Sequence, residues 1–161
     1  MARRIPTVIE FSVGHDEAVA AAMDELSARH GGWVNLIPES DPDDDPPVRG
    51  GLSTLLLAGA VHDVPTCTWV AGKNTRHGVQ PDQVGIQHAV GTRVLGRLRD
   101  ELGPLPEGWA LVQDHPRRGL VVEPCAADTH NAVLAWILEA GMLLSTVRLT
   151  GAWQAEVHRP A

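Results

Sequence analysis

The end of the chain alternates between apolar and polar residues, and this alternation restricts the fold more than any other feature. Successive side chains of a β-strand point to opposite faces, so the alternation predicts a strand with one buried and one solvated face. Antiparallel sheets accept a solvated face, whereas parallel sheets are covered on both sides. The segment therefore favours a mostly antiparallel sheet with helices on one face. Its apolar residues are Val147, Leu149, Trp153, Ala155 and Val157, and the polar residues between them are Arg148, Thr150, Gln154, Glu156 and His158.

Patterns of the same kind divide the rest of the chain into strands and helices. Further strands are predicted over residues 5–13, 33–37, 52–60, 65–71, 109–113 and 119–123, and helices over residues 16–30, 81–102 and 128–141. From residue 65 onward the order is βαββαβ, the split βαβ order of a ferredoxin-like unit. We therefore predict a single α+β domain over residues 1–161, with a mostly antiparallel sheet, about three helices and a ferredoxin-like arrangement in residues 65–158.

Composition argues against several classes of protein. The 161 residues include 20 acidic and 13 basic side chains, a net charge of −7 that disfavours binding to a phosphate backbone. Tyr and Phe, which stack on bases, number zero and one in this chain. No apolar run suits a membrane span or a signal peptide, so we expect a cytoplasmic protein without a membrane partner. The two cysteines form no CxxC pair, and neither a metal nor a cofactor is predicted.

The first candidate site is a basic loop between a predicted strand and the predicted helix that begins at Pro81. Lys73, Arg76 and His77 lie in this loop, and Lys73 is the only lysine of the chain. Free amides at a helix N-terminus attract anions, and cations beside them add to that attraction. The loop therefore predicts a site for a small anion. The alternative is a solvated loop whose charges keep it away from the core.

A second candidate lies early in the same predicted helix, where polar residues enter its apolar stripe. Gln87 falls inside the stripe and His88 falls near its edge. A polar side chain in a dry environment needs a hydrogen-bond partner, so these residues either line a pocket or bond within the core. Both interpretations stay open.

Several aspartates and histidines are close neighbours in the sequence. Neighbours on a strand point to opposite faces, so such a pair is not by itself a catalytic dyad. A site would need residues that converge from distant segments. The neighbours are His15-Asp16, His62-Asp63, Asp114-His115 and Asp128-Thr129-His130.

An acidic, proline-rich segment over residues 38–50 is predicted to be a mobile surface loop. Asp41, Asp43 and Asp45 have the spacing of a calcium-binding loop. Pro46 and Leu52 stand where that loop needs a glycine and a bidentate glutamate, so a calcium site is not predicted. Residues 39–49 are expected to be dispensable for folding.

The segment from Ala132 to Leu144 carries only one charged residue, Glu139, and is apolar on nearly every side. A helix of this kind is buried on nearly every side. One interpretation is a homodimer in which this helix packs on a second subunit. The other is burial within the monomer, and the pattern does not separate the two.

We therefore expect a self-associating binding domain that takes a small anionic ligand or a protein partner. The second hypothesis is a small hydrolase or transferase that uses His77, His88 or His115 as an acid–base group, with Asp114 in support. The third and weakest is an RNA-binding domain on the open face of the sheet. No sequence motif identifies a catalytic residue.

Overall fold

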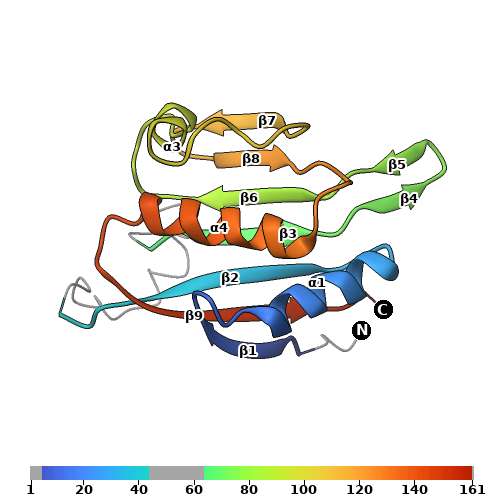
Figure 1. The fold of residues 1–161 in the computed structure, drawn as a ribbon, viewed down its shortest axis with the longest axis horizontal. Helices are drawn as coiled ribbons and strands as arrows, with labels where there is room; N and C mark the ends of the chain where they lie inside the picture. Colours follow the sequence, from blue (N-terminus) through green and yellow to red (C-terminus); the bar gives the residue numbers. More distant parts are fainter. Residues whose placement is uncertain (1–4, 44–63, 161) are drawn as a thin grey trace, which may run out of the picture.

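The computed structural model describes residues 5–43 and 64–160. Seven strands form one sheet: β1 (Thr7–Ser12), β2 (Trp33–Ser40), β3 (Thr66–Val70), β6 (Gln83–Gln87), β7 (Ala110–His115), β8 (Gly119–Glu123) and β9 (Leu149–His158). Their order across the sheet is β1-β9-β2-β3-β6-β8-β7, and every neighbouring pair is antiparallel (Figure 1). The predicted α+β class with an antiparallel sheet is confirmed.

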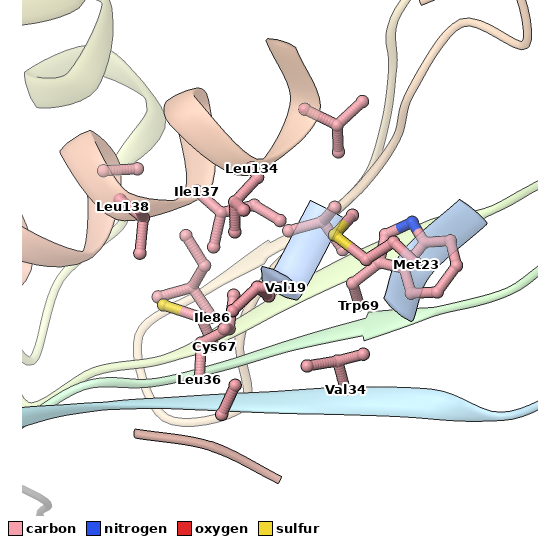
Figure 2. Packing of buried hydrophobic residues seen from close by; sticks show 14 of the residues in the cluster. Val19, Met23, Val34, Leu36, Cys67, Trp69, Ile86, Leu134, Ile137 and Leu138 are labelled. Carbon is pink, nitrogen blue, oxygen red and sulfur yellow. The ribbon is translucent and has the colours of Figure 1, made fainter. Parts of the chain in front are cut away.

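Three helices lie within the described residues: α1 (Glu17–Ala28), α3 (Leu95–Leu102) and α4 (His130–Leu144). Figure 1 shows α1 and α4 side by side in front of the sheet. Inward-facing side chains of the central strands meet apolar side chains of these two helices and exclude water between the two layers. Figure 2 shows this contact among Val34, Leu36, Cys67, Trp69 and Ile86 of the sheet and Val19, Met23, Leu134, Ile137 and Leu138 of the helices. No helix of the described residues is both long and apolar enough to cross a membrane.

The alternating C-terminal segment forms β9, as predicted. Trp153, Ala155 and Val157 are buried in the core, whereas Gln154 and Glu156 face the opposite side and are partly exposed. β9 lies between β1 and β2, which are parallel to each other and joined by α1. This is a split βαβ unit, and a second one consists of β6, α3 and β7 with β8 between the two parallel strands.

The ferredoxin-like arrangement predicted for residues 65–158 is present only in part. The elements β6, α3, β7, β8, α4 and β9 do follow one another in the βαββαβ order. However, β2 and β3 stand between β6 and β9, so the last strand joins the N-terminal half of the chain. The sheet is completed by residues from outside the predicted unit.

The helix predicted over residues 81–102 is wrong in its first half. Residues Gln83–Gln87 form β6, in which Val84 and Ile86 face the core and pair with strands on both sides. Short apolar runs fit a helix and a strand equally well, and β-branched residues between two partner strands favour the strand. The helix begins only at Leu95. At its N-terminus, Asp114 accepts hydrogen bonds from the backbone amides of Val94 (2.9 Å) and Leu95 (3.1 Å).

Two predicted loops also need correction. Residues 72–80 contain a hairpin of β4 (Lys73–Thr75) and β5 (Gly78–Gln80), which projects from one end of the sheet (Figure 1). Gly78 has a φ of +124°, a conformation that glycine adopts easily. The strand β2 continues through residues 38–40, where a loop had been expected. The rest of that loop from residue 44, the predicted strand 52–60 and the connection 61–63 lie outside the described residues.

Candidate functional site

A cluster around His130 joins three segments that are far apart in the sequence. His130 is the first residue of α4, whose N-terminus is capped by Thr129 through a hydrogen bond from the Ala132 amide to Oγ1 (3.2 Å). Its Nδ1 lies 2.5 Å from Asp24 Oδ1 on α1, and its Nε2 lies 3.4 Å from Asp82 Oδ2 just before β6. Its ring also contacts the edge of Trp69, with the ring centroids 5.1 Å apart. The cluster therefore holds α4, α1 and the sheet together at one end of the molecule.

The neighbouring carboxylates favour the charged form of His130. The hydrogen bond to Asp82, followed by the bond to Asp24, raises the pKa of His130 above its usual value. Burial alone would raise the pKa of Asp82, but hydrogen bonds from His130 and from the Gly72 amide (2.7 Å) lower it. Both ring nitrogens of His130 are thus occupied, so this histidine has no free lone pair with which to act as a base. Its role in the site is to position neighbouring groups.

We expect His130 to give the folding stability a marked pH dependence. Because folding raises its pKa, its full contribution to the free energy of unfolding is present below the unfolded pKa of about 6.5. That contribution is lost as the pH rises through the folded pKa. The free energy of unfolding should therefore fall by about 1 kcal/mol above pH 6.5. In urea titrations, His130→Gln should remove this decrease, and Asp24→Asn should reduce it. A His130→Gln variant with the same decrease would contradict this role.

A cavity of about 250 Å³ opens beside the cluster. Its walls come from the end of α1, from the β4–β5 hairpin and from the connection between β8 and α4, which all lie at one end of the sheet (Figure 1). His30, Lys73, Gln80, Asp82, Asp128 and His130 supply most of its polar groups. The rest of the lining includes Val79, Pro124 and Val133, so the site combines apolar walls with a few polar side chains, as ligand sites generally do.

The polar groups of the cavity differ in whether they are already paired. Asp82 bonds to His130 and Gly72, and Asp128 accepts a hydrogen bond from Trp109 Nε1 at 2.5 Å. By contrast, Lys73 forms no ion pair with any described residue. Among the described residues, Asp82 is paired with a histidine, Asp128 meets only the neutral indole N–H, and the Lys73 ammonium has no ion-pair partner.

His30 enters the cavity from an unusual backbone position. It follows α1 with a φ of +53°, and within the described residues it is the only residue other than glycine with a positive φ. Its amide donates to Ser27 O, and the Gly31 amide donates to Leu26 O, which is the Schellman ending usually occupied by glycine. A non-glycine residue there costs about 1 kcal/mol. Such positions occur often at functional sites, and His30 is one of the residues that line the cavity.

The structure separates the residues of the predicted anion site. Lys73 lines the cavity, but Arg76 and His77 lie in the turn between β4 and β5, where Arg76 Nε donates to His77 Nε2 at 2.9 Å. No helix follows this loop, because β6 does, so the free helix amides expected beside Lys73 do not exist there. The prediction of a helix N-terminus at this site is wrong.

The second predicted site lies elsewhere. Gln87 and His88 are at the far end of β6, and Gln87 bonds to the backbone oxygen of Arg118 (3.1 Å). His88 is buried, and neither of its ring nitrogens has a hydrogen-bond partner in the structure. Burial lowers the pKa of His88, although the nearby Asp114 partly opposes this effect. His88 is thus a buried residue outside the cavity, and its burial favours the neutral form.

The groups named for a hydrolase or transferase do not meet in one place. Asp114 caps α3, and His115 Nδ1 accepts hydrogen bonds from the amides of Arg117 and Arg118 (both 3.1 Å) in the β7–β8 turn. His77 lies at the hairpin tip, and His88 is buried. Across residues 5–43 and 64–160, no three His, Cys, Asp or Glu side chains are arranged to hold a metal ion.

Comparison of the chain with protein-family models, with curated proteins and with solved structures gives no match.

Proposed function

We propose that the protein is a binding domain for a small anionic ligand, which occupies the cavity beside His130. The observation that carries this proposal is the ammonium group of Lys73, which lines the cavity and has no ion-pair partner among the described residues. Asp82 is already bonded to His130 and Gly72, and Asp128 to Trp109. An ammonium group attracts phosphate or carboxylate oxygens, and His30, which also lines the cavity, can serve as a second donor.

The size of the cavity restricts the ligand. Sites for drug-sized molecules typically measure about 300–1,000 Å³. The volume here, about 250 Å³, suits a smaller molecule such as phosphate, sulfate or a short carboxylic acid. A cytoplasmic location and a homodimer remain parts of the proposal.

We expect Lys73→Ala to weaken the binding of inorganic phosphate by about tenfold or more, since a hydrogen bond to a charged group contributes about 1.5–3 kcal/mol. Binding is measured by calorimetry and by the rise in melting temperature with phosphate concentration. The matched control is Arg76→Ala, which removes the same charge from the tip of the same hairpin. If both variants weaken binding equally, the hairpin attracts anions only through its overall charge.

A second variant separates the His30 side chain from its backbone. Glycine adopts the +53° φ without strain, so His30→Gly should raise the melting temperature while lowering the affinity for phosphate. A gain in stability with unchanged affinity would remove His30 from the site.

The structure offers no comparable observation for the other hypotheses. His130 has both nitrogens occupied, and the other candidate acid–base groups lie apart. The hydrolase or transferase and the RNA-binding domain therefore remain sequence-based hypotheses.

A further inference from the structure

Two opposite charges line the cavity beside His130 without pairing with each other. Lys73 lies on β4 of the hairpin, and Asp128 lies in the connection between β8 and α4. Among the described residues, neither side chain has an ion-pair partner. The other carboxylate of the lining, Asp82, already pairs with His130. The cavity therefore presents one cation and one carboxylate that are both without a partner of opposite charge.

The carboxylate of Asp128 is held in a fixed position with one oxygen free. Trp109 Nε1 donates to its Oδ2 at 2.5 Å, and Trp109 packs in turn on Trp136. The backbone amide of Asp128 donates to the Cys125 oxygen (3.1 Å), which fixes the turn before α4. No described residue donates a hydrogen bond to Oδ1. This oxygen can therefore accept a hydrogen bond from a ligand.

The backbone of Lys73 is also fixed. Lys73 pairs with Gln80 across the hairpin. The base of the hairpin is tied to the cavity wall by the hydrogen bond from the Gly72 amide to Asp82 Oδ1 (2.7 Å). The ammonium group of Lys73 is thus carried on a strand that is anchored beside the His130 cluster.

A ligand that is only an anion would compensate one of these two charges. A phosphate ion bound to Lys73 would be repelled by Asp128 in the same cavity. A molecule with both a carboxylate and an ammonium group would compensate both charges. The cavity volume of about 250 Å³ accommodates a molecule of this kind with a short carbon chain, for which Val79, Pro124 and Val133 supply apolar contacts.

We infer that the ligand is a short amino acid, whose carboxylate binds Lys73 and whose ammonium group donates a hydrogen bond to Asp128 Oδ1. This inference rests on the proposed function, because it identifies the anionic group at Lys73 as the carboxylate of the ligand. Hydrogen bonds between two charged groups are stronger than those between neutral groups, so the ammonium group should add clearly to the affinity. The two opposite charges would also fix the direction in which the ligand lies.

The experiment compares amino acids with acids of the same carbon chain that lack the ammonium group. Calorimetry on the full chain would measure alanine and β-alanine against propionate, and γ-aminobutyrate against butyrate. These three amino acids place the ammonium group at increasing distances from the carboxylate. At least one of them should bind about tenfold more tightly than its matched acid, the effect expected of a hydrogen bond between charged groups.

One variant tests the role of Asp128 in this gain. Asp128→Asn keeps the shape of the side chain and an oxygen that can accept from Trp109. It should remove the gain from the ammonium group without weakening the binding of propionate. The control is Asp100→Asn, which removes the same charge from an exposed position on α3, outside the cavity, and should keep the gain. Thermal unfolding would check that both variants are folded.

The results separate this inference from the proposed function. If the acids bind in a manner that depends on Lys73 but no amino acid binds more tightly than its matched acid, the inference is wrong and the proposed function stands. If phosphate, the acids and the amino acids all fail to bind, both are wrong. An equal loss of the gain in Asp128→Asn and Asp100→Asn would assign it to the net charge and would also overturn the inference.

Discussion

Replacing Gly119 with alanine is expected to destabilise the protein by about 3 kcal/mol, because two costs combine. Gly119 begins β8 with a φ of +84°, where a side chain is strained. A Cβ atom there would lie 2.3 Å from the backbone oxygen of Ile86 in β6. Neither group can move away easily, since β6 and β8 pair at this point. Urea unfolding of the purified variant measures the loss.

The matched control is Gly85→Ala in the neighbouring strand. Gly85 has no strained φ, and a Cβ atom there meets nothing within 4 Å. Alanine should be neutral or slightly stabilising at this position, because it loses less entropy than glycine on folding. Similar unfolding midpoints for the two variants would contradict the close approach of β6 and β8.

Replacing Trp136 with glutamate should destabilise the monomer by about 3 kcal/mol, the scale of losing a large aromatic side chain from a packed site. Trp136 is half-buried on α4 and packs on Trp109, with the ring centroids 5.0 Å apart. Trp109 also donates a hydrogen bond to Asp128 at the wall of the cavity. The substitution should therefore also weaken phosphate binding in the cavity. Thermal unfolding and phosphate binding measure the two effects.

This variant also tests the predicted dimer. Most of the apolar residues of α4 have partners within the chain, since Val133, Leu134, Ile137, Leu138 and Leu144 are all buried, whereas Met142 is exposed. The all-round apolar pattern therefore no longer requires a second subunit, although a dimer stays a prediction. The control is Ala135→Glu, the exposed neighbour of Trp136. If Trp136→Glu halves the mass in solution and leaves the melting temperature unchanged, the indole is at a subunit interface.

The sequence predicted the elements whose side chains repeat regularly and whose ends carry clear signals. β9 follows from strict alternation, and α4 from a segment that is apolar on nearly every side. The same approach failed at β6. Ile86 belongs to a helical stripe in the sequence, and only the partner strands β3 and β8 make it part of a sheet. A local sequence pattern cannot show which distant strands will pair with a given segment.

The site was less predictable than the fold. Lys73 was found because it is the only lysine and lies between two glycines. The pairing of His130 with Asp82 and Asp24 joins residues 48 and 106 positions apart, and no local pattern connects them. The sequence indicated Asp128 and His130 only as close neighbours. In the structure both line the cavity, and Asp128 is held there by a hydrogen bond from Trp109. His30 had no signal, because its positive φ is visible only in the folded chain.

The central claim is that a small anion binds beside Lys73 and His130, and its location can be measured directly. We would titrate ¹⁵N-labelled protein with inorganic phosphate and follow the backbone amides by NMR, using sodium chloride at equal ionic strength as the control. We expect saturable shifts at Lys73, Asn74, His30 and His130. Shifts centred on Arg76 and His77, or on Gln87 and His88, would contradict it, and so would shifts that never saturate.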